Sequence, residues 1–99
     1  MNPLIVHEDA ERELWEAVDY YETKSTGLGL DLEKEIRQAF KHILISPRQF
    51  QRRKYNTRCY LLKRFPYSIY FLEFENIIWI VAIAHMKRKP FYWHNRLKE

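Results

Sequence analysis

Cysteine, glycine and long apolar runs are all scarce in this chain. Of its 99 residues, one is cysteine, Cys59, and two are glycine. A single cysteine cannot form an intramolecular disulfide, so we expect a buried thiol in a reducing compartment. The longest apolar run, residues 77–84, is far shorter than the ~20 residues that a membrane-spanning helix needs. These absences exclude a disulfide-rich scaffold and a helical membrane protein, and they predict a cytoplasmic protein.

Acidic side chains are scarce in the second half of the chain. Residues 47–99 hold three acidic and twelve basic side chains, a net charge of +9, whereas residues 1–46 hold ten acidic and five basic ones, a net charge of −5. The two halves sum to the overall charge of +4. A basic surface of this kind attracts polyanions or acidic proteins. The aromatic residues among the bases could stack on nucleic acid or fill a core beneath a solvated basic face, and composition leaves both open.

The first half shows helical spacing. A short apolar run over 4–7 predicts a first strand, and Asp9 is the expected N-cap of a helix over 9–24. The glycines in 25–29 predict a joint, after which a second helix opens at Asp31 and ends before Pro47. The acids of the first helix, Glu13 among them, lie off its apolar stripe and are expected to face solvent. Two such helices form a helical hairpin.

The second half is rich in strand-forming residues. Strands are expected over 58–65, 67–74 and 77–85, with a tight turn at Glu75–Asn76. The last of these strands is apolar on both faces, which predicts that it is covered on both sides. Residues 49–55 could add a basic edge strand, and residues 86–99 are expected to form a loop with a possible short terminal turn.

This order of elements predicts one α+β domain over residues 1–99. An N-terminal strand is followed by an α-helical hairpin packed on one face of a three- to four-stranded, mainly antiparallel sheet, and then by a basic C-terminal tail.

Four local strings resemble the RelE/ParE superfamily of toxins from type II toxin–antitoxin, or plasmid-stabilisation, modules. They are EAVDYY at 16–21, GLG at 27–29, RFPYSIY at 64–70, and AIAH at 82–85 followed by RKPFYW at 88–93. The resemblance covers nearly the whole chain and implies the same fold. RelE-like members cleave mRNA in the ribosomal A site without metal, ParE-like members poison DNA gyrase without cutting, and a few have no proven toxicity. The resemblance also implies an acidic antitoxin partner that covers the basic surface.

Metal-free RNA cleavage needs an acid, a base and fixed cations. His85 could serve as acid or base, or it could hold the tail by a backbone hydrogen bond. Arg88 matches a recurrent arginine of the superfamily. Tyr92 falls where RelE-like nucleases carry a tyrosine that works in cleavage, although its ring could instead pack on the sheet edge. These three are the candidate catalytic residues if the protein is a nuclease.

Four cations are candidates for binding nucleic acid or a protein target: Arg58, Arg64, Lys87 and Arg88. Arg58 and Arg64 are six residues apart on one expected strand, so they should share a face and could clamp a phosphate or an acidic partner, or simply be solvated. Trp93 should anchor the tail or stack on a base, and His94 should lie at the surface.

A metal site is not expected. The basic half holds only three acids, two beside a turn and the third at residue 99, which argues against a two-metal nuclease, and no histidine spacing forms a ligand set. We expect no cofactor, no metal and no small-molecule ligand.

Two departures from the nuclease pattern decide the preferred function. Ser68 stands where nucleolytic members usually have arginine, and Met86 stands where they often have another base. Losing two phosphate-facing cations would remove several kcal/mol of transition-state stabilisation. The arginine, proline and tryptophan after His85 are closer to the ParE branch. We therefore predict a ParE-like toxin that binds an enzyme such as DNA gyrase, with a RelE-like, ribosome-dependent mRNA endonuclease as the alternative and a non-toxic interaction module as a second alternative.

Overall fold

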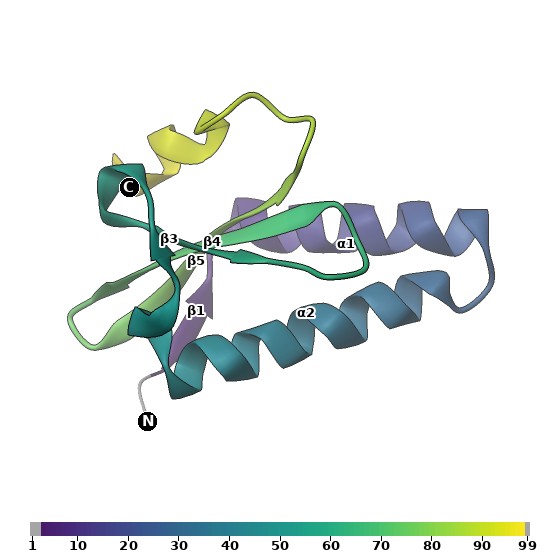
Figure 1. Cartoon of the computed structure of the whole chain (residues 1–99). Helices are drawn as coiled ribbons and strands as arrows, with labels where there is room; N and C mark the ends of the chain where they lie inside the picture. Colours follow the sequence, from purple (N-terminus) through teal and green to yellow (C-terminus); the bar gives the residue numbers. More distant parts are fainter. Residues whose placement is uncertain (1–2, 99) are drawn as a thin grey trace.

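Two antiparallel helices cover one face of a five-stranded sheet, and the C-terminal segment crosses the other face (Figure 1). The computed structural model describes residues 3–98. In chain order the elements are β1 (Leu4–Val6), α1 (Glu8–Lys24), α2 (Leu28–Ile45), the 3₁₀ turn η1 (Pro47–Gln49), β2 (Gln51–Arg52), the turn η2 (Lys54–Asn56), β3 (Arg58–Leu61), β4 (Tyr67–Phe74), β5 (Ile77–His85) and the 3₁₀ segment η3 (Tyr92–Lys98).

The sheet order is β1-β5-β4-β3-β2, and the pairing explains why its strand count exceeds the predicted three or four. β1 pairs with β5 in parallel, and the two-residue strand β2 adds at the opposite edge. The other contacts are antiparallel, as predicted. The predicted bounds of β4 and β5 are confirmed, as is the turn between them, where Glu75 and Asn76 take φ values of 51° and 62°.

The N-cap prediction for the first helix is wrong by two residues. α1 begins at Glu8, and the cap is His7, whose Nδ1 accepts the backbone N–H of Asp9 at 3.0 Å. Asp9 instead lies in the first turn, where a carboxylate is favoured by the exposed N–H groups of the helix.

The second helix begins at Leu28, three residues before the predicted Asp31. Gly27 provides the turn with a φ of +87°. The Glu22 carboxylate then accepts the backbone N–H groups of Gly27 at 2.9 Å and Gly29 at 3.0 Å, so the first helix caps the second. At Gly29 a Cβ would come within 2.4 Å of a backbone oxygen of α1, so this glycine allows the two helices to approach closely.

Strand β3 ends at Leu61, four residues earlier than predicted. The carboxylate of Glu35 on α2 accepts the backbone N–H groups of Lys63 at 2.7 Å and Arg64 at 3.3 Å. These bonds pull the segment toward the helices and end its pairing with β4. The expectation that Arg58 and Arg64 share a strand face is therefore wrong.

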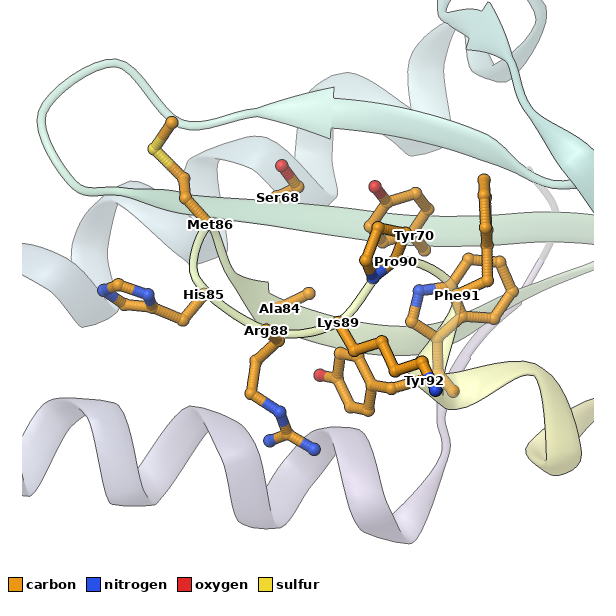
Figure 2. A pocket seen from close by; sticks show the side chains of 11 residues that line it. Ser68, Tyr70, Ala84, His85, Met86, Arg88, Lys89, Pro90, Phe91 and Tyr92 are labelled. Carbon is orange, nitrogen blue, oxygen red and sulfur yellow. The ribbon is translucent and has the colours of Figure 1, made fainter.

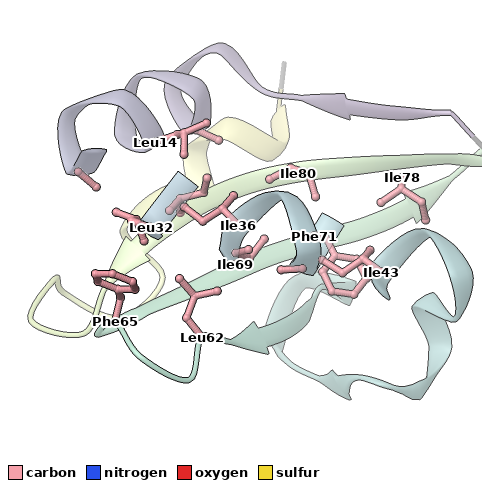
Figure 3. Close-up of a cluster of buried hydrophobic side chains, with 14 residues drawn as sticks. Leu14, Leu32, Ile36, Ile43, Leu62, Phe65, Ile69, Phe71, Ile78 and Ile80 are labelled. Atoms are coloured by element: carbon pink, nitrogen blue, oxygen red, sulfur yellow. The ribbon is translucent and has the colours of Figure 1, made fainter. Parts of the chain in front are cut away.

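The main core lies between the helices and the sheet (Figure 3). The predicted helix stripes supply Leu32, Ile36 and Ile43, which are fully buried against Ile69 and Phe71 of β4. A register shift places one extra residue of β5 opposite Tyr70 and Phe71. Such a bulge rotates the strand, and both Val81 and Ala82 consequently contribute to the cluster on the other face.

The tail covers that second face. Trp93 of η3 is 1% exposed and packs in a cluster with Val81, Ala82 and Tyr70. β5 is thus covered on both sides, as predicted, and Trp93 anchors the tail. The segment expected to be mostly loop is ordered as η3 because this packing holds it. None of the helices in the described part of the chain is long and apolar enough to cross a membrane.

Candidate target-binding site

A cavity of about 240 Å³ opens between the tail and the helix-free face of the sheet (Figure 2). Its floor comes from Ser68 and Tyr70 of β4 and Ala84 of β5, and the segment 85–93 forms its walls. Within the described chain, the cations that line this cavity are Arg88 and Lys89, and no carboxylate lines it. The cavity is therefore electropositive.

The two residues that depart from the nuclease pattern both line this cavity. Ser68 lies on the floor, and Met86 lies at the rim with 75% of its surface exposed. A hydroxyl and a thioether cannot supply the positive charge that a guanidinium would bring to those positions. The cavity therefore carries less positive charge for binding a phosphate than it would with basic residues at positions 68 and 86.

Tyr92 and Arg96 are tied to the first helix through Glu13. The Tyr92 hydroxyl donates to Glu13 Oε2, and Arg96 donates to both oxygens of the same carboxylate at 2.8 and 2.9 Å. Glu13 Oε1 also accepts the backbone N–H of Ile83 at 3.0 Å, and Arg96 donates to the carbonyl of Val81 at 3.0 Å. The Glu13–Arg96 ion pair therefore provides hydrogen-bond partners for backbone groups of β5 at positions where β1 no longer pairs with it.

This network is largely shielded from water. The side chains of Arg96 and Glu13 are only 14% and 12% exposed. Asp9 adds a second carboxylate 3.7 Å from Arg96 Nε. Burial, followed by the hydrogen bond and the charge of Glu13, raises the pKa of the Tyr92 phenol above its ordinary value. The phenol therefore keeps its proton to a more alkaline pH than an ordinary tyrosine does.

Arg88 and Tyr92 lie together, whereas His85 does not join them. The Arg88 guanidinium carbon is 3.8 Å from the centre of the Tyr92 ring, in cation–π contact. The His85 ring points away from both (Figure 2) and meets Tyr67 edge-on at 5.0 Å. Its Nδ1 accepts the backbone N–H of Lys87 at 3.0 Å, which is the backbone-holding role considered above.

The other predicted cations lie elsewhere. Arg58 donates to the carbonyl of Phe50 at 2.8 Å, on the helix-covered face, and Arg64 lies 3.5 Å from Asp31 near the start of α2. Lys87 is exposed on the loop but does not line the cavity. Of the four proposed binding cations, Arg88 alone faces the cavity.

A cluster of rings fastens the tail to the turn η2. Tyr55 stacks on His94, with ring centres 4.5 Å apart, and also contacts Phe91. Tyr55 and Phe91 have φ values of 62° and 58°, a conformation that costs non-glycine residues about 1–3 kcal/mol. The stacking contacts offset this strain. His94, expected at the surface, is half-buried because of the stack.

Comparison with known proteins agrees with this architecture. The family model described as the ParE toxin of the type II toxin–antitoxin system parDE matches residues 4–90. The chain belongs to this ParE toxin family. Among curated protein sequences, none matches significantly.

Solved structures share the fold of this ParE family member at low sequence identity. A chain from the chromosomal ParDE toxin–antitoxin system of P. aeruginosa has a TM-score of 0.75 and 23% identity, over 88% of this chain and 98% of that one. A chain of the intact E. coli RelBE toxin–antitoxin complex gives a TM-score of 0.68 and 14% identity, over 89% and 100%. The isolated E. coli RelE toxin gives 0.66 and 14%, over 99% and 98%.

Sequence reasoning missed Glu13 and Arg96. Glu13 was expected to face solvent because it lies off the apolar stripe of α1, yet it lies against β5 and the tail. The side of α1 that carries Glu13 lies next to the part of β5 that follows Ile80, where β1 no longer pairs with the strand. Arg96 lies in a tail whose path no periodicity predicts. Within residues 3–98, no cluster of three or more side chains could hold a metal ion.

The raised pKa of Tyr92 predicts a loss of stability at alkaline pH. Below its unfolded-state pKa of about 10, Tyr92 is neutral in both the folded and the unfolded state, and its full contribution to the free energy of unfolding is present. As pH rises from there toward the higher folded pKa, the unfolded state ionises first and the contribution is lost. We expect urea unfolding to show a steeper fall in stability between about pH 9 and about pH 11 for the wild type than for Tyr92→Phe. Equal slopes would contradict the assignment.

Proposed function

We propose that this protein is a cytoplasmic, ParE-like toxin that inhibits growth by binding DNA gyrase through the electropositive cavity, without cleaving nucleic acid. The observation that carries the proposal is that the Tyr92 hydroxyl donates to Glu13 beside a cavity lined by the cations Arg88 and Lys89. Because this bond fixes the tail in place, the electropositive wall of the cavity is a rigid surface that suits recognition of an acidic patch on a protein.

The same geometry disfavours the RelE-like alternative. A cleaving tyrosine must exchange a proton with its substrate, but the Tyr92 hydroxyl is occupied by a carboxylate and its pKa is raised by burial. His85 points away from Tyr92 and accepts a backbone N–H, so it does not complete an acid–base pair. Binding therefore requires less rearrangement of this site than catalysis does.

An acidic antitoxin is the expected neutralising partner. The outer surface of α1 carries exposed acids such as Glu11, Glu16 and Asp19, which repel a partner of the same sign. The tail cavity with Arg88 and Lys89 lacks this repulsion. The basic sheet face is therefore favoured over the outer surface of the helical hairpin as the docking surface for the antitoxin.

A supercoiling assay tests the proposal and the role of Arg88. Purified protein should inhibit gyrase, and Arg88→Ala should weaken inhibition by about thirtyfold, equivalent to about 2 kcal/mol for a central charged contact. Arg37→Ala is the matched control, because Arg37 is an exposed arginine on α2, remote from the cavity, and its removal changes the net charge equally.

Three results decide the outcome. Inhibition that is lost in Arg88→Ala, kept in Arg37→Ala and reversed by the product of a neighbouring acidic reading frame supports the toxin. Normal supercoiling at a large excess of toxin overturns gyrase as the target. Cuts in translated mRNA that disappear in Tyr92→Phe would establish the nuclease instead.

A further inference from the structure

A second cavity, of about 150 Å³, lies on the opposite face of the sheet and is lined by three arginines. Arg48 comes from η1, Arg52 from β2 and Arg58 from β3. Arg52 pairs with Arg58 in the register, and Arg58 pairs with Phe71, a residue of the helix-side core. Directly paired residues share a face, so the cavity opens beside the C-terminal end of α2 and is independent of the tail cavity.

The guanidinium groups of Arg52 and Arg58 are held in place by hydrogen bonds but keep donors that these bonds do not use. Arg58 Nη1 donates to the carbonyls of Phe50 at 2.8 Å and Arg48 at 3.3 Å. Arg52 Nη2 donates to the side-chain oxygen of Asn56 at 2.6 Å. A guanidinium has donors on all three nitrogens, so these bonds fix the orientation of the forks without exhausting them.

The charges in this cavity are not balanced. Among the described residues that line it, Glu73 is the one carboxylate, and its Oε1 lies 3.4 Å from Arg48 Nε. Three cations and one anion leave a net charge of +2. Like charges gathered in one hollow repel each other, and an anion entering between them would remove that repulsion.

The arrangement of the arginines favours a carboxylate over a nucleic-acid strand. The three come together in one small cavity, whereas a strand of phosphates needs cations spaced along a track and exposed rings for its bases. Phe71, the one aromatic residue among the described residues that line the cavity, is fully buried and cannot stack on a base. Planar, bidentate donation from arginine matches a carboxylate.

We propose that this arginine cavity, formed by Arg48, Arg52 and Arg58, is a second binding site that accepts a glutamate or aspartate side chain from an acidic peptide segment of a partner protein. Glu73 acts as an internal competitor, because it occupies Arg48 when no such segment is bound. The site goes beyond the proposed action at the tail cavity and does not depend on it.

The test uses the whole 99-residue chain and a hexaglutamate peptide, with binding followed by amide NMR shifts of residues 48–58 and 71–73. Arg52→Gln and, separately, Arg48→Gln should weaken binding about tenfold. Glu73→Gln should tighten it several-fold, because it frees Arg48. Glu75→Gln is the matched control: it changes the net charge equally but lies in the exposed β4–β5 turn, outside the cavity, and should leave the affinity unchanged.

The opposite signs for the arginine and Glu73 variants separate a site from general attraction by a basic protein. Equal tightening by Glu73→Gln and Glu75→Gln would overturn the site, as would peptide-induced shifts confined to other residues. Tighter binding of oligothymidylate than of the peptide, with loss in the same arginine variants, would overturn the carboxylate assignment in favour of phosphate. Because the assay contains no gyrase, its result is independent of the supercoiling experiment.

Discussion

Replacing Glu13 with alanine should lower the free energy of unfolding by about 3–5 kcal/mol. The substitution removes the acceptor for Tyr92, both hydrogen bonds from Arg96 to the Glu13 carboxylate and the partner of the Ile83 N–H. Arg96 would remain a mostly buried cation with Asp9 at 3.7 Å as its remaining carboxylate among the described residues. A buried charge that has lost its close partner is far more costly than a lost surface pair.

Urea denaturation measures this effect, and Glu16→Ala is the control. Glu16 is exposed on the same helix and should change stability by no more than about 0.5 kcal/mol. Limited proteolysis should show early cleavage within residues 86–98 in Glu13→Ala only. A destabilisation below about 1 kcal/mol would mean that the tail is held by its apolar contacts alone.

Trp93→Ala should cost about 3–5 kcal/mol as well, through loss of packing and creation of a cavity. The ring is 1% exposed and lies 4.8 Å from Tyr70, centre to centre. A domain of this size is typically stable by about 5–15 kcal/mol, so the loss would leave a protein near its unfolding threshold. Thermal unfolding should show a midpoint lowered by at least about 10 °C.

Trp15→Ala provides the comparison for Trp93. Trp15 is 40% exposed on α1, and its removal should cost markedly less because part of its surface already contacts water. Similar losses for both variants would show that burial of Trp93 against the sheet does not carry the effect.

The two long strands and both helices could be predicted because their signals are local. Apolar spacing identified the helices, and the asparagine-containing turn identified the β4–β5 hairpin. The end of β3 could not be predicted, because it is imposed by Glu35, which lies 28 positions earlier in the chain than Lys63. The start of α2 was misplaced for the same reason, since its cap comes from Glu22 on another helix.

The candidate site was predictable only in part. Arg88 and Tyr92 were placed together by their proximity in the sequence and by the family strings. The sequence does not identify Glu13 as the partner of Tyr92, because Glu13 resembles the exposed acids of α1 in its spacing. Only the path of the tail in the folded protein distinguishes it. His85 was assigned to the right place on the sheet, but no sequence signal indicates which way an imidazole points.

The long span of the Glu13 network has a consequence for synthesis on the ribosome. Glu13 is separated from Tyr92 by 79 positions and from Arg96 by 83. The helical hairpin emerges first, and the segment that walls the cavity emerges only after nearly all of the sheet has been translated. A nascent chain therefore cannot complete the Glu13 network, or fix the wall of the tail cavity in place, until translation has passed Arg96.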